Sequence, residues 1–374
     1  MQIEVYDMQT NGTDISITLE AVCDSFSSLL WDVEYYQCGQ FEIYIAANPR
    51  NIEIFKTERI VGRSDDKIHY GIIESVKLET DAENGDYLTV TGRFLMSLLS
   101  RRIIYPTINW RVPSAYWQIV RFAIEANCVN NLLAGNRIIP GLERGTIEGD
   151  CWQAKTRMQV SYVNLMEWVY KICEKIGGTV NIRLQETAIG SGQYKMLFDL
   201  SEGTNRSILQ DKNPHIVFSD TYNNLLSFSY SENTAIQQNF AYVLGRGEGV
   251  DRKRTVYFNG DEPSFLDRYE VYVDAKDISD EEQRNSETVQ IPDDEYVELL
   301  KARGSEKIVP AQVASESEIA VNSTQYQYNK DYFVGDYVTI QHKRVGLSQP
   351  KIQLVGMVES FDQNGRGLTP TFRI

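Results

Sequence analysis

Residues 15–23, with the sequence ISITLEAVC, set the first expectation for the fold, because apolar and polar side chains alternate along them. A period of two is typical of an antiparallel strand with one buried face. Residues 41–45 (FEIYI) alternate in the same way, and the apolar positions in residues 70–78 predict a third strand. Asn84-Gly85 provides residues for a tight hairpin turn before a fourth strand. The first hundred residues therefore predict a meander or a small β-barrel.

Helices are predicted after this strand-rich stretch. Residues 94–99 place their apolar side chains on one helical face. Ser114 is expected to cap a second helix, and a third helix with strong 3.6-residue periodicity begins near Ser161 and is stopped by Gly177. Two strands separated by a glycine-containing turn are predicted within residues 179–200. The central part of the chain is therefore predicted to be α+β.

Strands dominate again from residue 216 onward, because apolar side chains recur with a period of two. The acidic segment at residues 277–287 lacks apolar periodicity and is expected to be an exposed loop that leads into a short helix at about residues 294–303. We interpret this loop and helix as an insertion. Three last strands are predicted at residues 337–342, 352–358 and 368–374. The predicted fold class is α+β with strands dominating.

Charge and composition exclude several classes of protein. The 374 residues include 37 Lys and Arg against 52 Asp and Glu, which gives a net charge of −15 and a pI near 4.8. This balance disfavours nucleic-acid and anionic-lipid binding, which normally requires clustered cations. Apolar residues make up 42% of the chain and charged residues 24%, so global disorder is excluded. The length suggests two or three domains.

No segment predicts secretion or a membrane span. The first residues lack the basic and apolar regions of a signal peptide. The longest apolar stretches, such as residues 94–99, are far shorter than the roughly 18 residues that a bilayer-spanning helix needs. We expect a protein that stays in a cytoplasm or leaves it by lysis.

Residues that serve in metal and acid–base chemistry are poorly placed. The three histidines, His69, His215 and His342, lie in or next to predicted strands, and none has another likely ligand beside it. Carboxylates are so abundant that a pair at glycosidase-like spacing carries no information. No nucleophile elbow, zinc-protease motif or phosphate-binding loop is present. We predict no catalytic residue, no metal site and no cofactor.

Two further groups of residues receive structural interpretations. The cysteines, irregularly spaced and without a CxxC pair, are interpreted as reduced and mostly buried. They are Cys23, Cys38, Cys128, Cys151 and Cys173. Residues 245–249 (GRGEG) follow a strand but lack the spacing of a nucleotide loop and have no helix after them. We interpret them as a strand connection in which Arg246, Arg252 and Arg254 pair with acidic neighbours.

Aromatic side chains are numerous, with 22 Tyr and five Trp. Tyrosine is favoured at protein interfaces because it combines apolar area with a hydrogen-bonding tip. Trp31, Tyr35, Tyr36 and Phe41 concentrate aromatic rings near the N-terminal strands. These four residues are predicted either to pack inside the N-terminal sheet or to form an interface, and the sequence leaves both readings open.

Several longer strings, taken in order, resemble one family. They are WDVEYYQCGQF at 31–41, LLSRRIIYP at 98–106, NPHIVFSDTYNNLLSFSY at 213–230, NFAYVLGRGEG at 239–249, RYEVYVDAKDIS at 268–279 and DYFVGDYVTI at 331–340. The chain resembles the siphovirus tail proteins of phages and prophages of Gram-positive bacteria, which are related to the baseplate hub proteins of contractile phages. The similarity runs from near residue 25 to the C-terminus.

The resemblance implies a hub or tail-tip component that ends the tail tube. Such hubs are similar to trimers in which two tube-like antiparallel β-barrels per chain form a pseudo-sixfold ring. The implied parts are an N-terminal barrel at residues 1–106, an α+β middle at 107–212 and a second barrel at 213–374, which carries the inserted acidic loop and helix at about 275–305. The implied location is the virion tail, assembled in the host bacterial cytoplasm.

The implied partners are further copies of the chain in a homotrimer and other tail proteins, namely the tail tube or distal tail protein, the tape measure and the tip or receptor-binding proteins. Three copies of a chain with charge −15 carry −45, and an acidic lumen would not retain passing DNA. No specific nucleic-acid binding is expected. Some related hubs carry C-terminal peptidase or glycosidase extensions, whereas this sequence ends in a predicted strand, so we expect a structural part and no enzyme.

The alternative function is a tail protein that binds or cleaves cell-wall glycan, with Trp and Tyr rings stacked on sugars and two carboxylates as acid and base. A mass measurement by light scattering and a peptidoglycan pull-down separate the two functions. A trimer without affinity for glycan supports the hub, and a monomer that retains glycan supports the alternative.

Overall fold

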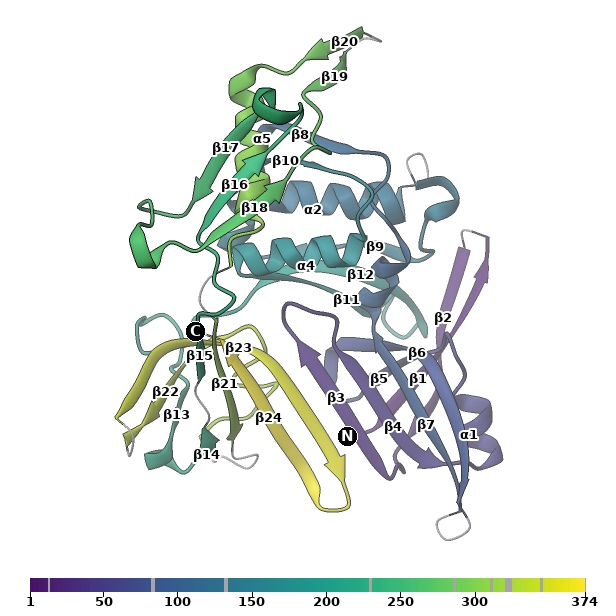
Figure 1. Cartoon of the computed structure of the whole chain (residues 1–374). Coiled ribbons are helices and arrows are strands. Elements are labelled where there is room, and N and C mark those ends of the chain that lie inside the picture. Colours follow the sequence, from purple (N-terminus) through teal and green to yellow (C-terminus); the bar gives the residue numbers. More distant parts are fainter. Residues whose placement is uncertain are drawn as a thin grey trace.

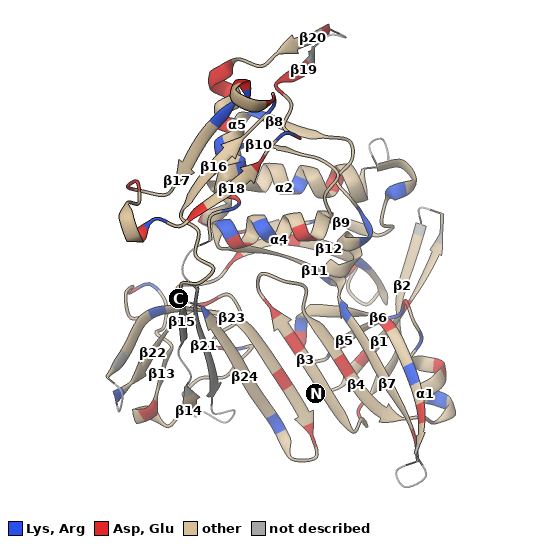
Figure 2. Ribbon diagram, in the orientation of Figure 1, with Lys and Arg blue, Asp and Glu red and all other residues tan. Residues whose placement is uncertain are grey.

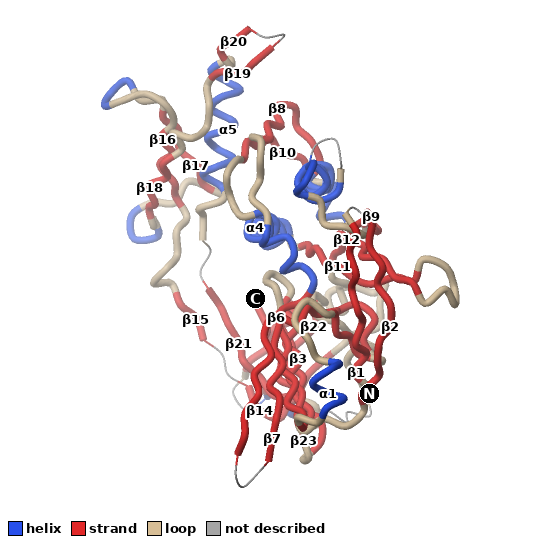
Figure 3. The backbone as a smooth tube through the Cα atoms, turned by 90° about the vertical axis from the view of Figure 1, so that its right-hand side faces the viewer, coloured by secondary structure: helices blue, strands red, loops and turns tan. Residues whose placement is uncertain are grey.

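The computed structural model describes residues 1–12, 14–81, 85–130, 134–228, 231–284, 287–309, 312–319, 325–343 and 346–373. Strands account for 49% of the structure and helices for 21%, which confirms the strand-dominated α+β class. The strands of the two chain ends form the lower body in Figure 1, and the long helices lie above it. The view from the side in Figure 3 shows the same division between a strand-built body and a helix-containing upper part.

The N-terminal part is a set of antiparallel strands. It contains β1 (Ile3–Asn11), β2 (Asp14–Cys23), β3 (Ser28–Glu34), β4 (Gln40–Ala46), α1 (Pro49–Ile54), β5 (Ile60–Arg63), β6 (Asp66–Asp81) and β7 (Gly85–Phe94). The strands pair in the order β2-β1-β5-β6-β7-β4-β3. Trp31, Phe41 and Ile43 lie on the buried face, as the alternating pattern predicts. The predicted turn residue Asn84 lies outside the described residues, and Gly85 has a φ of +86°.

The middle part combines helices with a small sheet. It contains the 3-10 helix Leu95–Arg101, β8 (Ile108–Ala115), α2 (Tyr116–Ile124), β9 (Leu142–Ile147), β10 (Lys155–Val160), α4 (Leu165–Ile176), β11 (Gly178–Glu186) and β12 (Gln193–Glu202). Strand β12 lies between β11 and β9, and its start also pairs with β2. The predicted cap Ser114 is wrong, because its hydroxyl donates to the Val112 carbonyl inside β8 and Ala115 precedes the helix. Asn164 caps α4, which ends at Gly177 as predicted.

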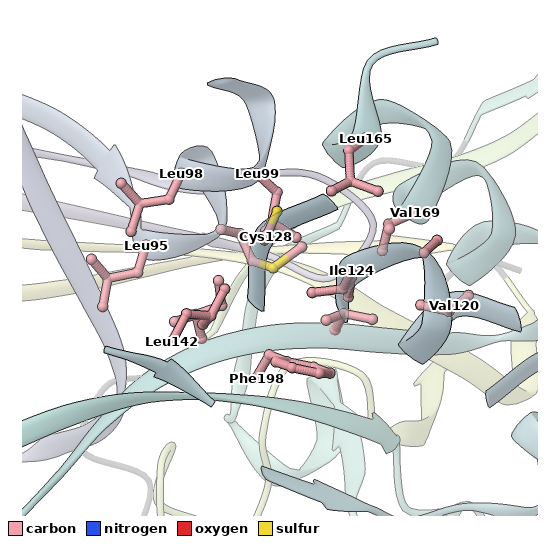
Figure 4. Packing of buried hydrophobic residues seen from close by; sticks show 14 of the residues in the cluster. Leu95, Leu98, Leu99, Val120, Ile124, Cys128, Leu142, Leu165, Val169 and Phe198 are labelled. Carbon is pink, nitrogen blue, oxygen red and sulfur yellow. The ribbon is translucent and has the colours of Figure 1, made fainter. Parts of the chain in front are cut away.

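The largest apolar cluster lies between the helices of the middle part and the strands beneath them. Figure 4 shows Leu99 of the 3-10 helix beside Cys128, with apolar side chains of α2 and α4 on the other side and Leu142 and Phe198 below. Leu99, Val120 and Val169 are fully buried. The 3.6-residue periodicity seen in the sequence therefore marks the faces of α2 and α4 that pack into this core.

The C-terminal part returns to the N-terminal sheet. It contains β13 (Val217–Ser219), β14 (Leu225–Phe228), β15 (Ser231–Asn233), β21 (Gln312–Ile319), β22 (Tyr337–His342), β23 (Leu347–Asp362) and β24 (Gly365–Arg373). The first half of β23 pairs with β22, and the second half pairs with β3 while β24 runs beside it. The two ends of the chain thus share one large mixed sheet. No closed barrel is detected among the described strands, so the two predicted barrels stay a prediction.

A segment of about 70 residues leaves the C-terminal part and returns to the same point. Gln238 and Val309 exchange two backbone hydrogen bonds of 2.8 Å, and we call residues 239–308 between them the insert. It contains β16 (Phe240–Leu244), β17 (Arg254–Phe258), β18 (Glu270–Asp274), β19 (Glu281–Arg284), β20 (Glu287–Gln290) and α5 (Asp293–Ser305). Its apolar cluster is separate from the other three.

The insert confirms one sequence prediction and corrects another. The short acidic-started helix expected at about residues 294–303 is α5. The loop expected at 277–287 is wrong in part, because β19 and β20 form an antiparallel hairpin there. Cross-strand pairing of polar side chains such as Gln290 and Glu281 stabilises this hairpin, and such pairs leave no apolar periodicity in the sequence.

Candidate functional site

The point where β3 meets β23 is reinforced by a buried ion pair. The Arg63 guanidinium donates to Glu359 Oε1 at 2.7 Å, and both side chains are 0% exposed. Arg63 also donates to both carboxylate oxygens of Asp65, at 3.1 and 2.9 Å. Arg366 Nε donates to Glu359 Oε2 at 3.0 Å. Because Arg63 ends β5 and Glu359 lies in β23, this pair joins residues 296 positions apart across the two ends of the chain.

A second buried polar group lies beside this pair. Asp66 Oδ2 accepts hydrogen bonds from Trp31 Nε1 at 3.1 Å and makes a 2.8 Å contact with His69 Nδ1. Burial by itself raises the pKa of Asp66, but the interactions with His69 and with the backbone N–H groups of Ile68 and His69 outweigh it and hold that pKa well below its ordinary value. The carboxylate is therefore a fixed negative charge that orients Trp31 and the start of β6.

The outer side of the joined sheet forms a polar surface that we call the junction face. One cross-strand row runs from Val358 through Asp32 and Gln40 to Arg93. The next row runs from Ser360 through Leu30, Glu42 and Thr91 to Ser75. A hollow of about 490 Å³ lies over these rows, lined by Leu30, Asp32, Gln40, Glu42, Glu74, Ser75, Thr91, Arg93 and Val358 among others.

The junction face carries more negative than positive charge. Arg93 is the one cation among the described residues that line the hollow, and it pairs with Glu74. The Arg93 guanidinium donates hydrogen bonds of 2.9 and 2.7 Å to the Glu74 carboxylate. Asp32 and Glu42 have no cationic partner among the described residues. Figure 2 shows the acidic segments of β3 within this sheet. The face is thus a polar surface with two uncompensated carboxylates per chain.

Burial changes the acidity of two carboxyl groups near this face. Burial raises the pKa of Asp32, and the hydrogen bond from Gln40 only partly opposes the effect. At the end of β3, burial followed by the charge of Asp32 raises the pKa of Glu34 to about 7. Glu34 therefore changes charge near neutral pH at the edge of the junction face.

A second hollow, of about 360 Å³, lies between the N-terminal sheet, the middle part and the C-terminal part. Glu34, Glu148 and Glu202 line this hollow. A glycan-cleaving site uses side chains of this type as its acid and base. Two of its aromatic residues, Tyr35 and Tyr170, are buried, and Phe333 is half-buried. All five tryptophans are described, and none of them is exposed. Among the described residues that line the hollow, no aromatic side chain is exposed, whereas the glycan-binding alternative needs exposed rings.

Each of the three histidines contacts a different partner. His69 contacts Asp66, His215 Nε2 lies 2.6 Å from the Gln210 carbonyl oxygen, and His342 lies beside Asp220. Within the described residues, no group of three or more His, Cys, Asp or Glu side chains is arranged to hold a metal ion. In the same residues, no helix is long and apolar enough to cross a membrane.

The cysteines and the glycine-rich segment behave as structural residues. All five cysteines are free, and burial raises the pKa of Cys128 to about 12, so its thiol is protonated at neutral pH. Residues 245–249 connect β16 to β17, and Arg246 and Arg252 pair with Asp280 and Asp274. These observations confirm the free cysteines and the strand connection, whereas no ion pair of Arg254 is found among the described residues.

The aromatic residues near the N-terminal strands pack in the core, which is one of the two possibilities that the sequence left open. Trp31, Tyr35 and Phe41 are buried, and Tyr36 is half-buried. The ion pair of Arg63 and Glu359 was not found from the sequence, because nothing in a single sequence links positions so far apart. The junction face was missed for the same reason.

Comparison with known proteins identifies the family of this chain. A sequence profile of the siphovirus ReqiPepy6 Gp37-like proteins matches residues 2–372. The chain belongs to the siphovirus ReqiPepy6 Gp37-like protein family. This membership confirms the resemblance to siphovirus tail proteins noted in the sequence. No curated protein sequence matches the chain.

Solved tail proteins share the fold of this Gp37-like chain. The tail protein from Neisseria meningitidis MC58 has a TM-score of 0.56 at 11% identity, over 100% of this chain and 96% of that chain. The 43 kDa tail protein of prophage MuSo2 from Shewanella oneidensis has a TM-score of 0.56 at 10% identity, over 100% and 98%. Prophage tail protein gp18 from Listeria monocytogenes EGD-e has a TM-score of 0.54 at 11% identity, over 100% and 94%. The Gp37-like chain thus shares its fold with these three phage tail proteins.

Proposed function

We propose that this tail protein is a hub or tail-tip component that joins the tail tube to the distal tip as a trimeric ring around a DNA conduit. The proposal assigns residues 1–106 and 213–374 to two tube-like units and residues 107–212 to an α+β connector. The protein acts through its shape and catalyses no reaction.

The junction face is the observation that supports this proposal. Its two halves come from opposite ends of the chain and join through β3 and β23 into one continuous surface. The surface is polar, and its cation Arg93 is neutralised by Glu74 while Asp32 and Glu42 are not. A wall of this kind repels phosphate groups and gives them no site at which to stop. Three copies placed around an axis supply six such half-surfaces, the number that matches a sixfold tube.

Two experiments test the proposal. Electron microscopy of virions that carry a labelled copy is expected to show label at the distal end of the tube, in a ring with threefold symmetry. Label along the whole tube contradicts a hub. The second experiment reverses charge on the junction face, with the substitutions Asp32→Lys and Glu42→Lys.

We expect virions with the reversed face to assemble and to release DNA more slowly, because cations on the wall retain the phosphate backbone. The matched control places the same charge change on the insert, with Asp251→Lys and Glu298→Lys, both on exposed positions. Equal ejection rates for the two variants contradict the assignment of the junction face to the conduit.

A further inference from the structure

The insert presents an apolar tip that none of the described residues covers. Phe265 is 95% exposed and Leu266 is 92% exposed, and we call this pair the apolar knob. The knob lies on a 3-10 turn in the loop between β17 and β18, at the left of Figure 1. Large apolar side chains exposed to this degree cost free energy in water unless another surface covers them.

The knob is held rigidly. Arg268 stacks on the Phe240 ring at 3.5 Å and donates to Glu262 at 2.8 Å. Asn239 Nδ2 donates to the Asp267 carbonyl at 2.7 Å. Phe265 has a φ of +51°, a conformation that is unfavourable for a bulky residue and that persists only where its surroundings fix it. A fixed and strained apolar tip is already ordered for binding, so it loses little entropy when a partner covers it.

Carboxylates surround the knob. Asp261 and Asp267 are exposed and have no ion pair among the described residues. Glu262 and Glu270 share the single guanidinium of Arg268. The loop therefore carries a local net charge of about −3, and it appears in Figure 2 as red segments around a tan turn. A partner for the knob needs an apolar surface with a positively charged rim.

The middle part of the same chain has a surface of this kind. Ile103, Tyr105, Tyr162 and Val163 are 48%, 51%, 66% and 40% exposed, and we call them the aromatic patch. The patch is contiguous, because Ile104 N donates to the Val163 carbonyl at 2.9 Å and the rings of Tyr105 and Tyr162 lie 6.0 Å apart.

The rim of the aromatic patch is basic. Arg137 donates to the Tyr105 carbonyl at 3.0 Å, and its guanidinium lies 5.9 Å from the Tyr105 ring. Arg102 donates to the Arg137 carbonyl at 2.6 Å. Neither arginine has a carboxylate partner within the described part of the chain. The patch thus offers two uncompensated guanidinium groups that match the acidic surroundings of the knob.

The insert and the aromatic patch lie at opposite ends of α4. The C-terminal end of α4 contacts the insert, where Lys175 donates to Ser305 of α5. The patch residues Tyr162 and Val163 precede the other end of α4, about 18 Å away for a helix of 12 residues. In Figure 1 the loop that carries the knob lies at the far left, beyond the insert-facing end of this helix. One copy therefore cannot cover its own knob with its own patch.

We propose that the apolar knob of one copy docks on the aromatic patch of the next copy, so that the chain associates head to tail. This inference rests on the proposed ring and names one of its contacts. A contact between two different surfaces generates a closed ring when the rotation between copies closes, as a trimer requires. Phe265 serves as the central anchor of the contact, and the charges of the rim orient it.

Variants of the whole chain, measured by sedimentation velocity, test this contact. The knob variant combines Phe265→Asn with Leu266→Asn, since asparagine tolerates a positive φ and removes the apolar area without a new charge. We expect its dissociation constant to rise by about thirtyfold or more, the effect of losing an interface hot spot. The control Val250→Asn changes a residue that is 94% exposed elsewhere on the insert, and it should associate as the unmodified chain does.

A mixing experiment gives the contact its direction. The patch variant is Tyr162→Asp. Aspartate tolerates the φ of +55° at this position, and its charge repels the acidic surroundings of the knob. Knob and patch variants are each expected to be monomeric, and an equimolar mixture is expected to form one-to-one dimers that grow no further. In each dimer, the intact knob of the patch variant docks on the intact patch of the knob variant.

Three outcomes overturn the inference. They are a knob variant that associates like the unmodified chain, a mixture that stays monomeric while the separate unmodified chain associates, and an unmodified chain that is monomeric at all concentrations. The first two leave the proposed ring in place with another interface. The ring itself is decided separately by the microscopy of virions, so a failure of the contact and a failure of the proposed function are distinguishable.

Discussion

Replacing Glu359 with Leu is expected to weaken the connection between the two ends of the chain. The substitution leaves the Arg63 guanidinium, 0% exposed, with Asp65 as its remaining charged partner, and Arg366 loses its carboxylate. A buried charge that loses its partner destabilises a protein by about 3–5 kcal/mol. We expect a loss of about 4 kcal/mol in the free energy of unfolding.

This loss converts into a measurable change in melting temperature. With about 2.1 cal/mol/K of unfolding entropy per residue, a chain of 374 residues has roughly 0.8 kcal/mol/K, so the melting temperature falls by about 5 °C. Urea denaturation should show the same free-energy loss as a lower midpoint. The double variant Arg63→Met with Glu359→Leu removes both buried charges, and it should recover most of the stability because a well-packed apolar pair replaces an ion pair with little net change.

The control for this experiment is an exposed ion pair. Glu298→Gln disrupts the pair with Lys301 on α5, where both side chains are more than 40% exposed, and it should change the free energy of unfolding by less than about 1 kcal/mol. A loss below about 1 kcal/mol for Glu359→Leu, or a double variant no more stable than the single one, refutes the reasoning that the buried pair holds the junction.

Three other substitutions or treatments have definite expected outcomes. The folded-state pKa of Glu34, about 7, lies above its ordinary value of 4.5, so the folded protein loses stability as the pH rises through this interval. The substitution Glu34→Gln should therefore raise the free energy of unfolding by about 2 kcal/mol at pH 8 and hardly change it at pH 4.5, as measured by urea denaturation. Cys128, buried and with a raised pKa, should resist alkylation at neutral pH until the protein is unfolded, as read by mass spectrometry; rapid alkylation in the native state would show that the cluster around it opens. Gly203→Ala would place a methyl group 1.8 Å from the Gly335 carbonyl oxygen and should lower the melting temperature, whereas Gly356→Ala, with a nearest contact of 3.2 Å, should lower it much less.

The sequence predicted the local elements well, because their signals are local. The alternation in residues 15–23 is strand β2, the helical face from Leu165 to Ile176 is α4, and the acidic start near Asp293 marks α5. The error at Ser114 has a local cause as well, since a hydroxyl that bonds backward to a strand carbonyl does not cap the helix that follows.

The long-range features were not predictable from one sequence. Strand β3 looks like any half-buried strand, and nothing in it indicates that its partner is β23, more than 300 residues later. Phe265 and Leu266 resemble core residues in the sequence, and only the structure shows that they are exposed. Charges such as Asp32 and Glu42 become meaningful only after the pairing places them on one face.

The two hydrogen bonds between Gln238 and Val309 have a consequence for how this chain can evolve. Paired residues in an antiparallel ladder lie about 5.5 Å apart, so the whole insert begins and ends at one point on the body. A genetic recombination event that exchanges this cassette for another, or for a two-residue turn, leaves the ladder between β15 and β21 in register. A single crossover can thereby give the chain a different exposed tip while the joined sheet of its two ends stays unchanged.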